Sequence, residues 1–171
     1  MARHVFLTGE KRIGKSTLLK KVLERYPGGA EGFRTVRTDA FLKDRYSVHM
    51  FAYGREMIPD ESNLLFVCGE KKEHISERFD RLGCGILSGC TGCALLVMDE
   101  LGPNEAGAAA FRSAVLRALD GETPIFGVLQ APCGVFWPEL AAHPSVGILK
   151  ITRENREDER LIGQILSLLG G

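Results

Sequence analysis

The sequence lacks an excess of charge of either sign, because its 171 residues include 22 Lys or Arg and 22 Asp or Glu. A balanced chain produces no overall field that attracts nucleic acid or an anionic membrane. It also lacks any apolar stretch of about 18 residues, the length that a membrane-spanning helix needs. The composition is that of an ordinary globular protein, with no strong nucleic-acid signal and no membrane span.

The sequence also has no internal repeat, low-complexity segment or linker-like stretch. Its length suits one domain with a substantial core, so we expect residues 1–171 to form a single domain. The apolar run that begins at His4 is too short for the apolar core of a secretory signal, so we expect no export signal.

An odd number of cysteines argues against a disulfide framework. The five cysteines are Cys68, Cys84, Cys90, Cys93 and Cys133. Cys90 and Cys93 form a C-x-x-C pair, with Cys84 nearby, which leaves a zinc or redox site open. No second C-x-x-C and no H-x-x-x-H lies near this pair, so free thiols shielded from solvent are the favoured interpretation.

The most informative segment present is GEKRIGKST, which matches the phosphate-binding loop pattern G-x-x-x-x-G-K-[ST] at every fixed position. We expect a strand over 4–8 before it and a helix over 16–25 after it, so that backbone N–H groups point at a bound anion. The residues expected to bind nucleotide are Gly9, Glu10, Lys11, Arg12, Ile13, Gly14, Lys15, Ser16 and Thr17. Lys15 can reach the β- and γ-phosphates as a catalytic cation, and the Ser16 hydroxyl can bind Mg²⁺.

An apolar strand expected over 94–99 ends in a pair of acids. Asp99 is expected to hold Mg²⁺ together with Ser16, and Glu100 to orient or deprotonate an attacking water. An acid at a strand end is common, but its pairing with a phosphate loop about ninety residues upstream makes the signal specific. Glu100 could instead make a local hydrogen bond, and Glu105 is a second candidate acid in the same loop.

Strands and helices alternate along the chain, which predicts an α/β three-layer sandwich with a mainly parallel sheet. Further strands are expected over 33–38, 46–52, 64–68, 124–129 and 146–151, and further helices over 74–87, 106–119, 136–142 and 158–169. The polar connection 39–45 predicts a small hairpin-like insertion. Because ligands bind outside the carboxyl ends of parallel strands, Gly9, Asp99 and Thr152 should gather at one edge of the sheet.

The loop after the last strand contains a third candidate element of the site. Asn155 could bond a base, and Arg156 could lie over the base or touch phosphate. A polar helix N-cap with solvated charges accounts for the same residues, and composition alone favours it. An arginine near the transferring phosphoryl group also promotes the reaction. The sequence does not choose among four candidates, Arg34, Arg37, Arg112 and Arg117.

These motifs resemble those of the small P-loop nucleoside-triphosphatases related to the thermophilic and cancer-related nucleoside-triphosphatases. The resemblance rests on the loop at 9–17, on Gly-Phe-Arg-Thr at 32–35 with Arg37, on Asp-Glu-Leu-Gly at 99–102 with Glu105 and Phe111, and on Thr-Arg-Glu-Asn-Arg at 152–156. It implies a Rossmann-like, kinase-related fold and Mg²⁺-dependent hydrolysis of ATP, GTP and possibly other nucleoside triphosphates. It also favours Asn155 and Arg156 near the nucleotide.

Two segments depart from that family. Residues 10–13 replace a Pro-Gly pattern and add the charges of Lys11 and Arg12 beside the phosphates. Pro103 and Asn104 replace a Lys-Met pair, so that hydrolysis could be slow or need a partner. Two alternatives therefore stay open. One is a small-molecule or nucleoside kinase, with its acceptor near Arg34, Arg37 and the 39–58 insertion. The other is a slow nucleotide-dependent switch read by a protein partner.

Two absences bear on these alternatives. No lid with paired arginines is evident after the middle helices, which counts mildly against the kinase. No Asn-Lys-x-Asp guanine signature appears near the late strands, which disfavours a regulatory GTPase. The nucleotide motif together with the lack of an export signal predicts a cytoplasmic protein, and the sequence gives no decisive signal for an oligomeric state.

Overall fold

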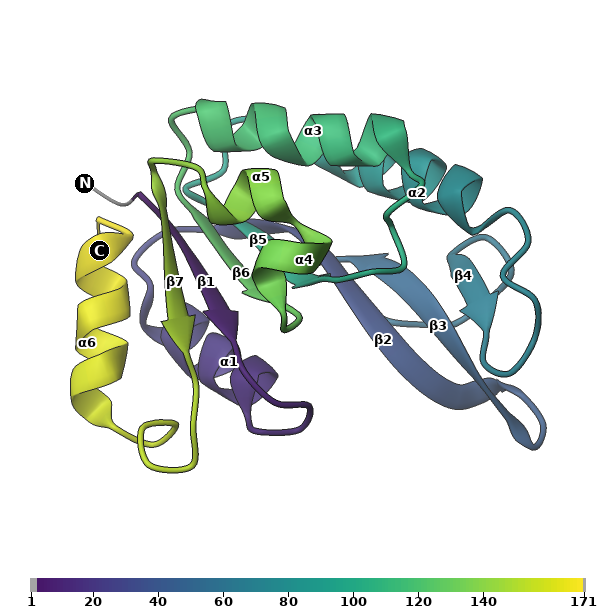
Figure 1. The fold of residues 1–171 in the computed structure, drawn as a ribbon, viewed down its shortest axis with the longest axis horizontal. Helices are drawn as coiled ribbons and strands as arrows, with labels where there is room; N and C mark the ends of the chain where they lie inside the picture. The colour runs from purple at the N-terminus through teal and green to yellow at the C-terminus, as the bar shows by residue number, and fades with distance from the viewer. Residues whose placement is uncertain (1–2, 171) are drawn as a thin grey trace.

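The computed structural model describes residues 3–170. Their seven strands form one sheet in the order β4-β3-β2-β5-β6-β1-β7 (Figure 1). The strands are β1 His4–Thr8, β2 Ala30–Leu42, β3 Arg45–Ala52, β4 Leu64–Val67, β5 Leu95–Leu101, β6 Ile125–Leu129 and β7 Val146–Lys150. From β2 to β7 every neighbouring pair is parallel, whereas β3 and β4 add antiparallel strands at one edge. The predicted α/β sandwich with a mainly parallel sheet is confirmed.

The helices cover both faces of the sheet. They are α1 Lys15–Arg25, α2 Ile75–Gly89, α3 Ala109–Asp120, α4 Cys133–Phe136, α5 Pro138–Ala141 and α6 Glu159–Leu168. One buried apolar cluster joins the sheet to α2, α3 and α5, and a second joins it to α1 and α6. Within residues 3–170, no helix is long and apolar enough to cross a membrane.

Alternation of side chains in the central strands explains why these apolar runs have no polar face. In β1, Phe6 enters the cluster under α2 and α3, whereas Val5 and Leu7 enter the cluster under α1 and α6. Successive residues of a strand point to opposite faces, so a strand covered on both sides must be apolar throughout. This burial fixes the sheet that carries the candidate site.

The predicted hairpin is present, but its connection is shorter than expected. β2 continues to Leu42 and pairs antiparallel with β3, which begins at Arg45. Most of the segment 39–45 is therefore strand, and Lys43 and Asp44 form the turn. Asp44 has a φ of 62°, the left-handed conformation that aspartate tolerates in tight turns. Pairing along the hairpin outweighs the polar composition that suggested a loop.

Three other predicted boundaries are also corrected. β5 runs past Asp99 to Leu101, because Leu101 pairs with Leu129 of β6. The short helix predicted over 136–142 is two one-turn helices, α4 and α5. α2 continues through its glycines to Gly89. A Cβ on Gly83 would lie 2.2 Å from the Phe111 ring, so the absent side chain allows α2 and α3 to pack closely.

The sheet order separates the two predicted motif strands. β6 lies between β1, which leads into the phosphate-loop segment, and β5, which carries Asp99 and Glu100. The residue that follows β6 is Gln130, so its side chain is delivered between the two motifs. β7 flanks β1 on the other side, which brings the loop at 152–156 to the same edge.

Candidate functional site

The glycines of segment 9–17 give the loop its shape. Gly9 has a φ of 145° and Gly14 a φ of 114°, conformations that residues with a side chain rarely adopt. A Cβ on Gly9 would lie 2.6 Å from the carbonyl oxygen of Ile151, next to β7. The loop turns tightly and then begins α1 at Lys15, so a helix N-terminus faces the space that the loop surrounds.

Lys15 is folded into this loop. Its ammonium donates to the carbonyl oxygens of Gly9 at 2.9 Å and Glu10 at 2.6 Å, and the residue is only 8% exposed. Burial lowers the pKa of Lys15, while the nearby charges of Glu100 and Asp99 act to raise it. A phosphate oxygen is a stronger acceptor for this cation than a backbone carbonyl, so the arrangement suits capture of an anion.

Ser16 and Asp99, the predicted Mg²⁺ ligands, lie together. The Ser16 hydroxyl is 3.5 Å from Oδ1 of Asp99, and Nε of Arg34 is 3.5 Å from Oδ2. Asp99 is 4% exposed, and burial raises its pKa to about 6, although the Arg34 charge opposes this. A hydroxyl and a carboxylate side by side are hard oxygen ligands of the kind that Mg²⁺ prefers, so the residues fit the ion.

Glu100 is held by Thr35 of β2 and by Gln130, which directly follows β6. Its Oε1 accepts a hydrogen bond of 2.6 Å from Nε2 of Gln130, and its backbone N–H donates to Oγ1 of Thr35 at 3.3 Å. Neither partner is local in sequence, so the local hydrogen bond considered for Glu100 is replaced by contacts with distant residues, and the bond from Gln130 orients the carboxylate. Gln130 was not predicted from the sequence, where its only signal is a polar residue directly after an apolar strand.

Glu105, the second candidate acid, is engaged in hydrogen bonds within the protein. Its Oε1 accepts hydrogen bonds from the backbone N–H of Gly102 and from Nε1 of Trp137, the latter at 3.2 Å. The residue is 2% exposed, and burial raises its pKa to about 7. These contacts fix the 102–105 loop against Trp137.

Asn155 and Arg156 lie on the β7 side of the loop. The Asn155 side chain accepts from the Thr152 N–H at 2.8 Å and donates to the carbonyl oxygen of Lys150 at 2.9 Å. Arg156 donates to the carbonyl oxygen of Ile13 at 3.3 Å, which places it against the phosphate-loop segment. Asn155 therefore shapes its own loop, and its contact with a base stays a prediction.

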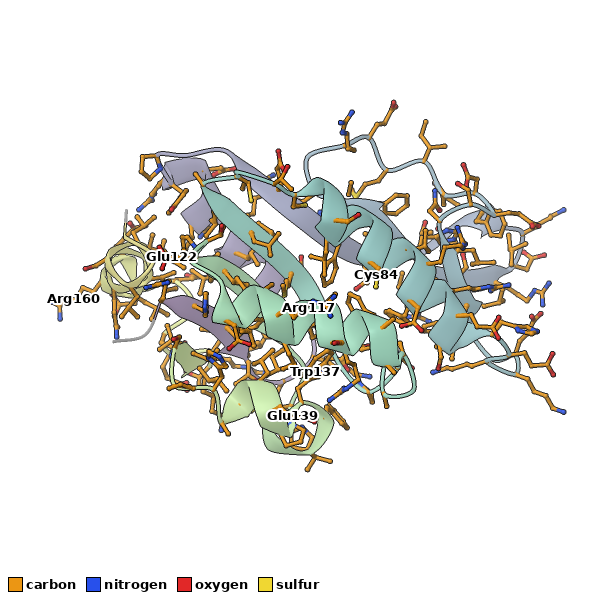
Figure 2. The ribbon with its side chains drawn as sticks, turned by 90° about the horizontal axis from the view of Figure 1, so that it is seen from above. Cys84, Arg117, Glu122, Trp137, Glu139 and Arg160 are labelled. Carbon is orange, nitrogen blue, oxygen red and sulfur yellow. The ribbon has the colours of Figure 1, made fainter. Side chains whose placement is uncertain are left out.

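The four candidate arginines divide into two pairs. Arg34 contacts Asp99, and Arg37 lines the cavity. Arg112 instead stacks on Trp137 at 3.9 Å and forms an ion pair with Glu139. Arg117 donates to Ser113 in its own helix, and Figure 2 shows it with Cys84 on the layer formed by α2 and α3. Arg34 and Arg37 alone among the four remain in reach of the site.

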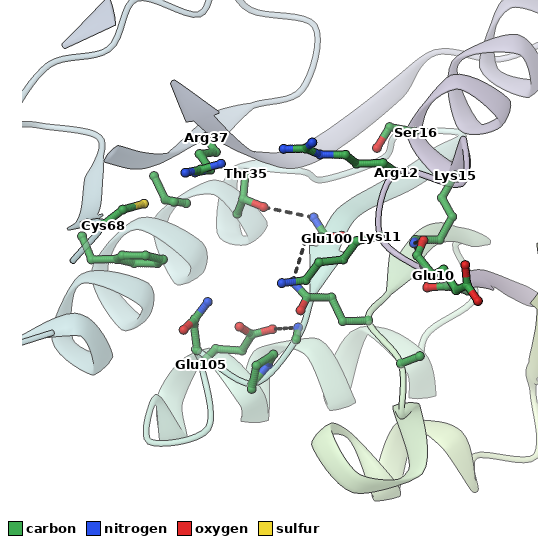
Figure 3. A pocket seen from close by; sticks show the side chains of 18 of the residues that line it. Glu10, Lys11, Arg12, Lys15, Ser16, Thr35, Arg37, Cys68, Glu100 and Glu105 are labelled. Atoms are coloured by element: carbon green, nitrogen blue, oxygen red, sulfur yellow. Dashed lines mark hydrogen bonds between the residues drawn. The ribbon is translucent and has the colours of Figure 1, made fainter. Parts of the chain in front are cut away.

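One large cavity is lined by Lys15, Ser16, Glu100, Glu105 and Gln130, whereas Asp99, Arg34, Asn155 and Arg156 lie outside its lining. Its volume is about 1170 Å³, and it extends from the 9–17 loop past Glu100 to the β2–β3 hairpin. Figure 3 shows Lys15 and Ser16 at one end, Arg37 and Cys68 at the other, and Thr35 and Glu100 between them. The cavity lining includes five cationic side chains and three carboxylates, so its composition favours an anionic ligand.

The cysteines lie outside this cavity except for Cys68. Cys84, Cys90 and Cys93 line a smaller cavity of about 410 Å³ beside α2 and α3. Burial raises the pKa of Cys90 to about 11, which keeps it a thiol at neutral pH. In the part of the chain from 3 to 170, no group of three or more His, Cys, Asp or Glu side chains is arranged to hold a metal ion.

Comparison with known proteins gives consistent results. A family model described as NTPase matches residues 4–166. The nucleoside-triphosphatase THEP1 of Methanosarcina acetivorans is 27% identical over 97% of this chain and 98% of its own length. The cancer-related nucleoside-triphosphatase homolog of Bos taurus is 27% identical over 91% of this chain and 92% of its own length.

Two solved structures share the fold. The crystal structure of THEP1 from Aquifex aeolicus superposes with a TM-score of 0.74 at 21% identity, covering 98% of this chain and 99% of that one. The solution structure of a human cancer-related nucleoside triphosphatase superposes with a TM-score of 0.62 at 24% identity, covering 97% and 96%. At these identities the superpositions establish the fold.

Proposed function

This chain belongs to the NTPase family, and from that premise we propose that it hydrolyses nucleoside triphosphates, ATP and GTP among them, to the diphosphate and phosphate in a Mg²⁺-dependent reaction. The membership and the curated relatives support a nucleoside-triphosphatase. The metal, the substrate range and the residue roles are the parts that this proposal adds.

Segment 9–17 is proposed to bind the triphosphate. Its backbone N–H groups and the N-terminus of α1 supply fixed positive dipoles, and Lys15 supplies a full charge. On binding, the Lys15 ammonium exchanges the carbonyl oxygens of Gly9 and Glu10 for phosphate oxygens. The cation then neutralises the charge that develops as the terminal phosphoryl group departs.

Ser16 and Asp99 are proposed to hold Mg²⁺, because their oxygens lie 3.5 Å apart at the end of the loop. When bound, the ion neutralises β- and γ-phosphate charge. Arg34 now occupies the other carboxylate oxygen of Asp99 at 3.5 Å. Release of this contact frees Arg34 to reach the phosphoryl group, which makes it the better-placed of the two arginines for that role.

Glu100 is proposed to orient and deprotonate the attacking water. Gln130 holds one carboxylate oxygen at 2.6 Å, and the other is available to accept a proton from water. Lys15 lines the same cavity, and the Glu100 charge acts to raise its pKa, so the carboxylate and the ammonium lie near each other. This juxtaposition of Lys15 and an oriented Glu100 is the observation that carries the proposal.

Asn155 and Arg156 are proposed to lie near the base. Arg156 reaches the loop at Ile13, and Asn155 fixes the segment that presents it. The Asn155 side chain is committed to backbone partners, so it offers little to distinguish one base from another. Loose base selectivity follows from this arrangement.

The test is phosphate release from ATP, GTP, CTP and UTP with Mg²⁺ and no acceptor. Lys15→Ala and Glu100→Gln are each expected to lower turnover by about 100-fold, the usual effect of removing one charge-stabilising group. Gln164→Ala, on the exposed side of α6, serves as the control and should keep wild-type turnover.

Nucleotide binding without turnover in the wild-type protein would contradict hydrolysis. That outcome would instead favour the kinase, which needs an acceptor, or the switch, which needs a partner.

A cytoplasmic location also stays a prediction, supported by the nucleotide-binding assignment.

A further inference from the structure

The cavity has a second end that triphosphate hydrolysis does not use. We name it the hairpin lobe, and its walls are Arg37, Tyr46, Val48, Phe66, Lys72 and Phe79. These residues come from β2, β3, β4, α2 and the segment before α2. Figure 3 shows Arg37 at the opposite end of the cavity from Lys15, with Glu100 between them.

The volume of the cavity and the direction of a nucleotide on the 9–17 loop both indicate that one bound nucleotide leaves the hairpin lobe accessible. The cavity volume of about 1170 Å³ exceeds the roughly 300–1,000 Å³ that holds one small ligand. A triphosphate on the loop with its base near Arg156 extends toward β7, on one side of β1. The hairpin lobe lies on the other side of β1, across β6 and β5.

Charge and ring chemistry define what the hairpin lobe can bind. The Arg37 guanidinium lies 4.1 Å from the centre of the Tyr46 ring, and the Lys72 ammonium lies 4.5 Å from the centre of the Phe66 ring. Lys72 also donates to Oδ1 of Asn104 at 2.6 Å. Two cations held beside aromatic faces can bond a phosphate while a ring of the ligand stacks nearby.

Neither cation is neutralised by the protein. Among residues 3–170, no carboxylate oxygen lies within 4.0 Å of the charged nitrogens of Arg37 or Lys72. Nearby arginines differ, because Arg34 is paired with Asp99 and Arg45 with Glu70. The buried rings of Phe66 and Phe79 complete an apolar wall beside these charges.

We propose that the hairpin lobe binds a second ligand beside the triphosphate, a planar aromatic compound that carries a phosphate, of the nucleoside monophosphate class. Its phosphate contacts Arg37 and Lys72, and its ring packs against Tyr46, the exposed ring of the lobe, beside the apolar wall of Phe66 and Phe79. This assignment rests on the proposed function in one respect, because it takes the triphosphate to bind the 9–17 loop. Hydrolysis is not required for the second ligand to bind.

Equilibrium dialysis of labelled AMP, GMP, CMP and UMP tests this. The intact chain is first saturated with Mg²⁺ and a non-hydrolysable ATP analogue, which occupies the loop. At least one monophosphate is expected to bind under these conditions, with an affinity at least ten times that for ribose 5-phosphate, which has no ring to stack. Displacement of every monophosphate by the analogue, or equal binding of ribose 5-phosphate, would overturn the proposal.

A neighbouring pair of lysines provides matched variants. Lys72→Gln removes a charge from the hairpin lobe but retains a donor for Asn104, whereas Lys71→Gln removes the same charge just outside the lining. Lys72→Gln should weaken monophosphate binding by about 10-fold, and Lys71→Gln should leave it unchanged. Equal affinities in the two variants would contradict the assignment.

Phosphate release from ATP, measured on the same variants, separates the two proposals. The control variant Lys71→Gln, whose charge lies outside the cavity lining, should hydrolyse ATP at the wild-type rate. A protein that binds monophosphate but does not hydrolyse ATP contradicts only the proposed function. A protein that hydrolyses ATP but binds no monophosphate contradicts only the hairpin-lobe assignment.

Discussion

The two ends of the large cavity are built in different ways. At the loop end, consecutive residues from Gly9 to Thr17 supply backbone N–H groups, glycine conformations and three cationic side chains. At the hairpin lobe, side chains from several elements converge, and the binding groups are cations beside rings. A site built from the backbone of one contiguous segment can therefore be recognised in the sequence. A site built from side chains of several elements forms only when the chain folds.

The loop end should be the most sensitive to a single added carbon. In Gly9→Ala, the new Cβ meets the Ile151 carbonyl oxygen at 2.6 Å at a φ of 145°. We expect nucleotide affinity to fall about 100-fold, because misplacement of about 1 Å in positioned groups has effects of that size. Titration with a fluorescent ATP analogue measures this.

Gly163→Ala is the control, because nothing lies within 4 Å of a Cβ at that position in α6. It should bind nucleotide like the wild type. Wild-type affinity in Gly9→Ala would show that the loop backbone does not make the site and would remove the contrast with the hairpin lobe.

Glu105, which lines the cavity, should make the free energy of unfolding depend on pH. Burial raises the pKa of Glu105 to about 7 from its ordinary 4.5, so the folded state prefers the protonated acid. The stabilising contribution is complete below the unfolded pKa and is lost as pH rises through about 7. The loss is up to about 3 kcal/mol, at 1.4 kcal/mol for each pKa unit.

Glu105→Gln retains an oxygen that can accept from Gly102 and Trp137 but cannot ionise. Urea unfolding at pH 5.5 and 8.5 should show a fall in the unfolding free energy of the wild type that is smaller in the variant. Identical pH dependence in both proteins would show that Glu105 is ionised without cost.

Gln130 orients Glu100, which lies between the loop end and the hairpin lobe of the cavity. Gln130→Ala removes the 2.6 Å hydrogen bond to Glu100 but leaves the phosphate-loop residues unchanged. We expect kcat for phosphate release to fall about 10-fold with little change in KM, because orientation of the water is lost while binding is kept. A rise in KM with kcat unchanged would instead place Gln130 in nucleotide binding.

The smallest effect is expected from the exposed charge of Lys11, which the family pattern lacks. Lys11 lines the cavity at the loop end and is exposed to solvent. Lys11→Gln should raise KM for ATP about threefold at low salt, with the difference shrinking as salt screens the charge. Lys20→Gln, exposed on α1 and outside the lining, should leave KM unchanged at either salt concentration.

Several features were predictable because they are local. The strand at 4–8, the phosphate-loop pattern and the following helix come from adjacent residues, and the structure has them at the expected places. Asp99 was expected near Ser16, and their oxygens are 3.5 Å apart. Parallel strands delivered both residues to one edge, as topology requires.

Other features depend on partners distant in sequence. The hydrogen bond from Gln130 to Glu100 exists because β6 inserts between β1 and β5, an order that no local pattern encodes. The exclusion of Arg112 from the site follows from its stacking on Trp137, whose position α4 and α5 set. The extension of β2 to Leu42 follows from pairing with β3.

The sequence by itself determined the loop end of the cavity, because glycine conformation and the backbone N–H groups of a helix N-terminus are properties of a short contiguous segment. Only the tertiary structure decided the hairpin lobe and the environments of Glu100 and Glu105. Their hydrogen bonds and burial arise when β2, β5, β6 and the 102–105 loop pack together. Such contacts depend on the sheet order and on desolvation, which involve residues that are distant in sequence.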